Sequence, residues 1–404
     1  MKKIFYLVAL FAAVMFTACD GSSVQTPDGD KTKLWPAGKK GSNLWGFMDK
    51  KGNLEIAAKY DAVYGFSCGW AMVKEDGEYQ FIDKSAKNKH SVDNEEKVDY
   101  YFFYNHCRFK DGIYRGMWDK DFAVVIPADY VILGRPTADK LVYFSEDKND
   151  EEGYGYLDMK GKVAIEPQWY DAYNFVDGMA VVMVKKGKDS DVSYKYGIIN
   201  TKGEYIVEPQ KNSLYSMGEN RFAMRKSNGK FVLCDKNLEE LSGSYDDMEP
   251  FCCGLSLVEK EEKGYGFIDK NGQEIVSCKY MYAEEYSDDL TFVVKDADSK
   301  VEVLDKKGES ILKLKEGEGP YSSFHNGLAL IGNYDSDANE YNYRYIDKNG
   351  ETVYKWTPGD EDDDDDDDDD DAPARWRKAN RRSIMQSEAA VLFDNYERAM
   401  QYIK

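Results

Sequence analysis

Histidine is scarce in this sequence, which contains only His90, His106 and His325, each far from the others. A zinc site or a catalytic triad with a histidine base needs such residues grouped with further ligands or a nucleophile. No glycine-rich loop of the phosphate-binding kind follows a strand either. The sequence therefore indicates no metal, no cofactor and no catalytic activity. A pair of carboxylates for glycoside hydrolysis stays an open alternative, because such a pair is defined by its position in the fold and not by a sequence motif.

Proline is also infrequent, with 10 residues against 33 glycines, 31 tyrosines and 19 phenylalanines. Aromatic residues favour strands, and glycine takes the backbone conformations that tight turns require. The composition therefore favours an all-β protein built from short aromatic strands that glycine turns connect.

Long apolar runs are absent except near the start, where Ile4 to Phe16 is too short to span a bilayer. Lys2 and Lys3 precede this run and small residues follow it, as in a secretory signal peptide. Phe16-Thr17-Ala18-Cys19 resembles a bacterial lipobox, with phenylalanine where leucine is usual. The resemblance implies removal of residues 1–18, lipidation of Cys19 and anchoring to the outer membrane of the cell envelope, facing the periplasm or the outside. An ordinary signal peptide with an incidental cysteine is the alternative.

Positive charge is in deficit, because the formal net charge is −21 and an unbroken acidic run extends from Asp360 to Asp371. An acidic exterior repels phosphate backbones, so we expect no nucleic-acid partner. The run itself cannot bury apolar surface and is interpreted as a spacer over residues 358–372. It lacks the wrapped loop of an ordered calcium site. Six cysteines follow Cys19 at irregular spacings, and they support no particular disulfide pairing.

A short motif recurs along the chain: aromatic, glycine, aromatic or aliphatic, aliphatic, then aspartate or asparagine. Clear copies begin at Trp45, Tyr154, Tyr196 and Tyr265, and weaker copies at Tyr79, Tyr114, Phe231, Val301 and Tyr343, at intervals of 34 to 42 residues. In the copy at Tyr154, Asp158 to Gly161 predicts a hairpin turn whose aspartate accepts backbone hydrogen bonds. We therefore predict eight to nine units over residues 44–357, each with three or four strands, after a flexible tether over residues 19–43.

A unit of about 35 residues cannot cover both faces of its own sheet, so neighbouring units must share a core. The rings that open each unit and Phe66, Phe175, Phe251 and Phe324 are the expected core. The unequal unit lengths favour an open, solenoid-like row, because ring closure requires a near-equal rotation per unit. A closed β-propeller is the alternative.

The ordered combination of an aromatic residue followed by Gly, Asp-x-x-Gly, Ile-x-Pro and Phe-x-x-Gly-x-Ala resembles the WG-repeat (KWG) family. The resemblance covers about Leu44 to Tyr354, and the units that contain Tyr114 and Phe231 depart from the pattern. It implies a bacterial, often envelope-associated repeat protein, and it supplies no catalytic residues.

The last segment, residues 373–404, differs in character because basic residues precede an amphipathic pattern. Apolar residues from Ser383 to Ile403 recur at spacings of three and four, which predicts a helix with one apolar side. This helix either caps the last repeat or docks on a partner protein. For docking, the candidate residues are Trp376, Arg377, Arg381, Leu392 and Tyr396.

Two function classes remain for the repeat array. The first is a protein-binding or scaffolding module held at the membrane through the lipid on Cys19. The second is binding or processing of glycans, in which the exposed rings of Trp118 and Trp169 would stack on sugars. Rings gathered in a cleft would favour sugar, whereas rings buried between units would favour the scaffold.

Overall fold

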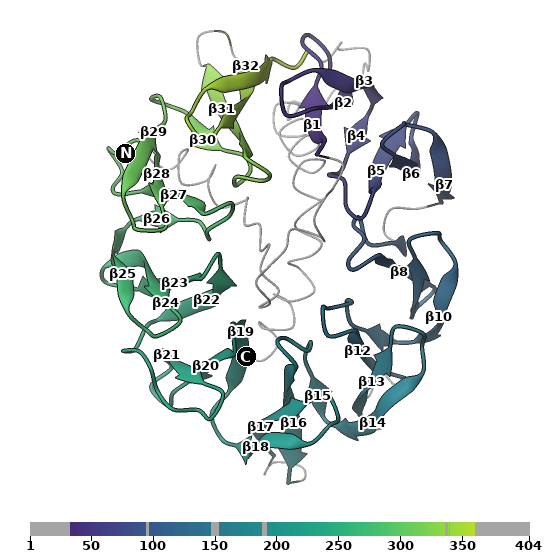
Figure 1. The fold of residues 1–404 in the computed structure, drawn as a ribbon, viewed down its shortest axis with the longest axis vertical. Helices are drawn as coiled ribbons and strands as arrows, with labels where there is room; N and C mark the ends of the chain where they lie inside the picture. The colour runs from purple at the N-terminus through teal and green to yellow at the C-terminus, as the bar shows by residue number, and fades with distance from the viewer. Residues whose placement is uncertain are drawn as a thin grey trace, which may run out of the picture.

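The computed structural model describes residues 33–93, 97–146, 153–187, 192–335, 338 and 340–359. All elements named in these ranges are strands, and they form nine small antiparallel sheets arranged in a ring (Figure 1). The predicted all-β repeat array is therefore confirmed. No helix within these ranges has the length and apolar character that a membrane span requires.

Each sheet is made from one continuous stretch of chain, and we number the sheets 1 to 9 in chain order. Sheet 1 contains β1 (Trp35–Gly38), β2 (Trp45–Met48) and β3 (Leu54–Tyr60); sheet 2 contains β4 (Ala62–Val63), β5 (Trp70–Glu75), β6 (Glu78–Asp83) and β7 (Asn88–Val92); sheet 3 contains β8 (His106–Asp111), β9 (Tyr114–Asp119) and β10 (Val124–Tyr130). Sheet 4 contains β11 (Ile132–Leu133), β12 (Leu141–Ser145), β13 (Tyr154–Asp158) and β14 (Val163–Trp169); sheet 5 contains β15 (Asp171–Ala172), β16 (Met179–Lys186), β17 (Ser193–Asn200) and β18 (Tyr205–Gln210).

The second half of the ring repeats this plan. Sheet 6 contains β19 (Leu214–Gly218), β20 (Arg221–Arg225) and β21 (Phe231–Asp235); sheet 7 contains β22 (Asp247–Cys252), β23 (Leu255–Lys260), β24 (Gly264–Asp269) and β25 (Glu274–Tyr280). Sheet 8 contains β26 (Tyr282–Ala283), β27 (Leu290–Val294), β28 (Glu302–Asp305) and β29 (Ser310–Lys313); sheet 9 contains β30 (Gly319–Pro320), β31 (Leu328–Asp335), β32 (Glu340–Asp347) and β33 (Thr352–Trp356).

Every sheet contains one copy of the aromatic-glycine motif, so the number of units is nine. The motif provides β2, β6, β9, β13, β17, β21, β24, β28 and β32 in turn. The two units that depart from the pattern, at Tyr114 and Phe231, give three-stranded sheets. Sheet 1, with its clear copy at Trp45, also has three strands, so the weaker motifs still form their strand and the number of strands does not follow the strength of the motif.

The aspartate turn has the predicted structural role. In sheet 4, Oδ1 of Asp158 accepts hydrogen bonds from the backbone N–H groups of Lys160 at 2.8 Å and Lys162 at 3.0 Å. Gly161 takes a φ of 79°, which costs glycine little. Equivalent side-chain bonds are made by Asp49, Asp83, Asp119, Asn200, Asp235, Asp269, Asp305 and Asp347.

Neighbouring sheets share their hydrophobic cores, as predicted. Between sheets 4 and 5, Tyr156 and Ile165 pack with Phe175 and Val182 in one buried cluster. The phenylalanines expected in the core are all buried: Phe66, Phe175, Phe251 and Phe324. Each sheet therefore depends on the next for burial of its apolar faces.

The array closes on itself, so the open row that we favoured is wrong and the alternative ring is correct. Sheets 1 and 9 share a cluster in which Trp45 and Trp356 meet edge to face, with ring centroids 5.7 Å apart. The Tyr354 hydroxyl donates to the Gly38 carbonyl at 2.9 Å. Unit length was a poor guide to whether the array closes. The extra residues of the longer units extend hairpins, as in β16 and β17, and leave the packed faces of the sheets unchanged.

Part of the range expected for the tether, residues 19–43, belongs to the ring, because Trp35–Gly38 forms β1 at the closing seam. Trp35 is 4% exposed and donates from its indole nitrogen to the His325 carbonyl at 3.1 Å. The expected signal peptide over residues 1–18, the acidic run and the basic C-terminal segment lie outside the described residues.

Candidate binding surfaces of the ring

Trp169, which we expected to stack on sugars, is a core residue. Its side chain lies at the end of β14, is 2% exposed and packs between sheets 4 and 5. The indole nitrogen donates to the Tyr205 hydroxyl at 3.0 Å, across to the outer strand of sheet 5. The expectation of an exposed ring failed because this position of the repeat belongs to the inter-sheet core.

Trp118 is half-buried, and aromatic side chains surround it. Its ring stacks on Phe109 with centroids 4.6 Å apart and meets His90 edge to face at 5.0 Å. Phe122 lies 6.0 Å away. This ring therefore packs in the cluster that joins sheets 2 and 3 and does not form an open platform.

The other predicted site residues, Cys19, Trp376, Arg377, Arg381, Leu392 and Tyr396, lie outside the described residues.

Charged groups that the sequence reading missed gather on the inner side of the ring. The first strands of sheets 7 and 8, β22 and β26, lie toward the inside of the ring (Figure 1). Glu249 belongs to β22, and Glu284 and Glu285 directly follow β26. Three carboxyl groups are therefore held by the inner segments of two neighbouring sheets.

Glu284 is 7% exposed and has two hydroxyl donors. The Tyr282 hydroxyl donates to Oε1 at 3.2 Å, and the Ser323 hydroxyl of sheet 9 donates to Oε2 at 2.9 Å. Burial raises the pKa of Glu284 to about 7, and the two hydroxyl groups oppose this shift only partly. This carboxyl group therefore exchanges its proton near neutral pH.

Glu285 and Glu249 influence each other and Glu284. Burial, and then the charges of Glu249 and Glu284, raise the pKa of Glu285 well above its usual value. Burial and the nearby Asp247 raise the pKa of Glu249 to about 7. Oε2 of Glu285 also lies 3.2 Å from Sγ of Cys252 in sheet 7. Together the three carboxyl groups can store protons and accept hydrogen bonds.

The carboxyl cluster does not resemble a metal centre. Within the described ranges, no three His, Cys, Asp or Glu side chains are grouped closely enough to hold a metal ion. Raised pKa values of buried carboxyl groups occur at functional sites as well as in structural clusters. The sequence does contain a signal for this cluster at one position of the repeat. That position is a tyrosine in three units, at Tyr64, Tyr100 and Tyr173, and a glutamate in the units of sheets 7 and 8, at Glu249 and Glu284.

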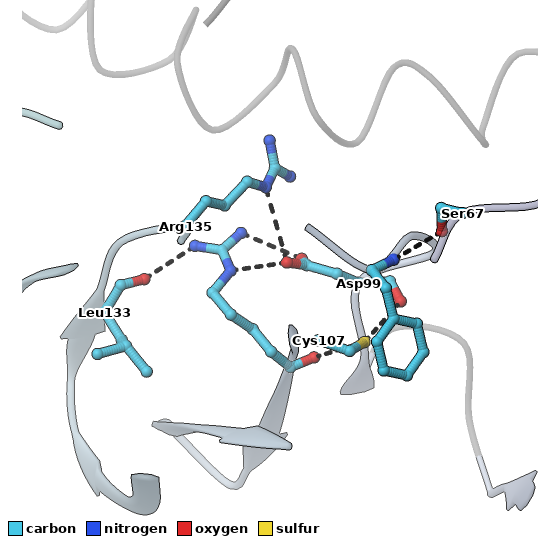
Figure 2. Close-up of polar contacts among 7 residues, drawn as sticks. Ser67, Asp99, Cys107, Leu133 and Arg135 are labelled. Carbon is cyan, nitrogen blue, oxygen red and sulfur yellow. Dashed lines mark hydrogen bonds and ion pairs between the residues drawn. The ribbon is translucent and has the colours of Figure 1, made fainter. Parts of the chain in front are cut away.

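A second polar cluster joins sheets 3 and 4 (Figure 2). The Arg108 guanidinium holds Asp99 with two hydrogen bonds, from Nε to Oδ2 at 2.7 Å and from Nη2 to Oδ1 at 3.1 Å. Its Nη1 also donates to the Leu133 carbonyl of sheet 4 at 2.8 Å. Arg135 approaches the same carboxylate, with Nε 3.6 Å from Oδ2.

This cluster fixes the position of two sheets. Arg108 is 6% exposed, so its charge needs the carboxylate beside it. Burial alone would raise the pKa of Asp99, but the guanidinium groups of Arg108 and Arg135 lower it to about 2. Asp99 therefore stays ionised, and the pair connects sheet 3 to the backbone of sheet 4.

Comparisons with known proteins agree with the repeat pattern. The family described as WG containing repeat matches residues 45–79, 154–188, 196–231 and 265–297. No curated protein matches the sequence.

Several solved structures align with most of this chain, at low identity and with low TM-scores. A eukaryotic initiation factor is 8% identical with a TM-score of 0.39, covering 83% of this chain and 91% of its own. A quinonprotein alcohol dehydrogenase-like protein from Bacteroides thetaiotaomicron is 12% identical with a TM-score of 0.30, covering 81% and 76%. BamB from Moraxella catarrhalis is 9% identical with a TM-score of 0.23, covering 80% and 85%. Scores this low support no argument about function.

The four matched segments begin at the four clear copies of the motif, at Trp45, Tyr154, Tyr196 and Tyr265, and the five weaker copies form equivalent strands. The chain therefore belongs to the WG-repeat family, with nine repeats in a closed ring.

Proposed function

We propose that this protein is a lipid-anchored module of the cell envelope that binds a partner protein and has no enzymatic activity. The observation that carries the proposal is the burial of Trp169 between sheets 4 and 5. A sugar-binding cleft would present such rings to solvent, beside carboxylates, whereas here the large rings join neighbouring repeats.

The ring offers a rigid and extended surface for a partner. Nine sheets share buried seams and the first seam closes with the last, so loops on either face keep fixed relative positions. Binding residues are commonly found on loops that such a scaffold positions. The lipid on Cys19 would hold this surface at the membrane.

Site-specific photo-crosslinking in intact cells tests the partner. A photoreactive residue is placed at Ile113 or Val124 of sheet 3, or at Ile311 of sheet 8, which are 53%, 57% and 48% exposed. We expect one defined protein adduct from one sector of the ring, which excess unlabelled chain removes. Saturable binding of the intact chain to a glycan array, without any protein adduct, would instead establish the carbohydrate function.

Fractionation tests the anchor separately. The intact chain is expected in the membrane fraction with label from a radioactive fatty acid, and Cys19→Ser is expected to lose both. Label that persists in Cys19→Ser would contradict the anchor without affecting the crosslinking result.

A further inference from the structure

The hairpin of sheet 9 is longer than the strands of the sheet against which it packs. Strands β31 and β32 each have eight residues, whereas β1, β2 and β3 of sheet 1 have four, four and seven. The half of the hairpin that contains Leu330 and its partner Tyr345 is buried in the seam with sheet 1. In the other half, Tyr343 still packs against this seam, whereas Tyr334 is 40% exposed.

The extended half carries a row of tyrosines on the same side of the sheet as the seam. Tyr334 pairs with Tyr341, and Gly332 pairs with Tyr343, so their side chains share the side of Leu330 and Tyr345. The rings of Tyr334 and Tyr341 are 4.9 Å apart, and those of Tyr341 and Tyr343 are 6.4 Å apart. We call Tyr321, Tyr334, Tyr341 and Tyr343 the tyrosine face.

Gly332 allows two of these rings to lie against the backbone. A Cβ atom at this position would be 2.4 Å from Cε2 of Tyr321 and 3.1 Å from Cδ1 of Tyr343. The face therefore combines closely packed rings near the seam with Tyr334, which is 40% exposed, at its outer end.

The chain leaves the described structure beside this face. Trp356, the last residue of β33, pairs with Tyr343, and their rings stack with centroids 5.3 Å apart. The N–H of Gly41 donates to the Thr357 carbonyl at 2.9 Å, so the exit is fixed against sheet 1. Residues 360–404 continue from this point.

We propose that the apolar side of the C-terminal segment Ser383–Ile403 docks on the tyrosine face of sheet 9 in the same chain. The residues on that side are Met385, Ala389, Leu392, Tyr396, Ala399, Met400 and Ile403. Residues 360–382 connect the ring to this segment. An extended chain spans roughly 3.3 Å per residue, so this connection can reach farther than the length of the eight-residue strands of the hairpin.

Position and chemistry both favour the C-terminal segment as the occupant of the tyrosine face. A segment tethered beside the face has an effective concentration on the order of millimolar, which a second copy or a foreign protein does not reach. An aliphatic helix side matches aromatic rings, and each contact removes apolar surface from water. A partner of the ring that needs this face must then displace the segment.

Hydrogen exchange of the full chain tests the docking. An isolated helix of this length is marginally stable, so slow exchange over residues 383–403 reports contact with the ring. We expect the double variant Tyr334→Ser, Tyr341→Ser to raise these exchange rates at least tenfold. The ring itself should keep its exchange pattern, because Tyr334 is at the exposed end of the hairpin.

Sheet 5 provides a matched control, because β16 and β17 also have eight residues each. Tyr194 is 38% exposed, and its ring lies 5.2 Å from that of Tyr170, much as Tyr334 lies beside Tyr341. Tyr194→Ser should leave exchange over residues 383–403 unchanged. Equal effects of Tyr194→Ser and the double variant would overturn the assignment.

A reciprocal measurement keeps the proposal testable if the tyrosine variant unfolds. Leu392→Glu should raise the rate at which tetranitromethane modifies Tyr334 several-fold and leave the rate for Tyr194 unchanged. Fast exchange over residues 383–403 in the wild type, or protection that rises with protein concentration and so marks a second copy, would contradict docking in cis.

Discussion

Gly52 of sheet 1 lies directly against the Val353 carbonyl of sheet 9: a Cβ atom on Gly52 would be 2.5 Å from that oxygen. The same turn glycine contacts the outer strand of the preceding sheet elsewhere. Gly308 of sheet 8 approaches Val276 of sheet 7, and Gly350 of sheet 9 approaches Leu312 of sheet 8. The closing seam thus repeats the geometry of the internal seams.

Gly52→Ala should destabilise the ring at its closing seam. The φ of Gly52 is 86°, which costs an alanine about 1 kcal/mol or more, and the clash with Val353 adds about 1 to 3 kcal/mol. Gly77→Ala is the control, because Gly77 has a φ of 84° with no atom within 4 Å of a Cβ. Urea unfolding should show a larger loss for Gly52→Ala, and equal losses would refute the close contact.

Trp169→Ala should lower the free energy of unfolding by about 3 to 5 kcal/mol, because it leaves a large cavity between sheets 4 and 5. Calorimetry or urea unfolding measures this loss. Trp169→Phe fills most of the volume but loses the hydrogen bond to Tyr205, so its loss should be smaller. A fully stable Trp169→Ala would mean that the ring is not a core residue.

Asp99→Ala should cost about 3 to 5 kcal/mol, because it leaves the buried Arg108 guanidinium without its carboxylate. The double variant Asp99→Ala, Arg108→Met removes both charges and should recover part of the loss. Comparison of the four proteins in a double-mutant cycle gives the coupling. No recovery in the double variant would show that the pair does not act as a unit.

The carboxyl cluster of sheets 7 and 8 should make the ring less stable as the pH rises from 5 to 8. Burial raises the folded-state pKa of Glu284 from 4.5 to about 7, so its stabilising contribution is complete below pH 4.5 and is lost as the pH passes through 7. The loss is on the order of 3 kcal/mol, since the folded-state pKa lies roughly 2.5 above the ordinary value and each pKa unit corresponds to about 1.4 kcal/mol.

Glu284→Gln cannot ionise and should flatten this pH dependence, as unfolding in urea at several pH values would show. Asp99 does not contribute to the pH dependence of the stability between pH 5 and 8, because its pKa of about 2 keeps it ionised throughout this range. An unchanged slope in Glu284→Gln would remove Glu284 as its source.

The strands of the ring could be predicted from the sequence because their determinants are local. An aspartate or asparagine turn ends all nine motif strands, including the weak copy at Phe231, and an aromatic residue followed by glycine opens the four clear copies. Ring closure could not be predicted, because it depends on contact between Trp45 and Trp356, which lie in the first and last sheets and far apart in the sequence.

The candidate sites were harder still to predict. Trp169 was misread because aromatic residues serve both cores and binding surfaces, and only the packing distinguishes the two. Glu284 went unnoticed in an acidic sequence, because its altered pKa results from burial beside sheet 9.

The closing seam also sets the order in which the molecule can be completed. Synthesis proceeds from the N-terminus, so Trp45 is made early and must wait for Trp356, which is among the last structured residues to emerge. Until then the newborn chain is an unfinished arc with a bare aromatic flank at each end. A premature stop within sheet 9 would leave both flanks uncovered, and such a product would be prone to aggregation and to degradation.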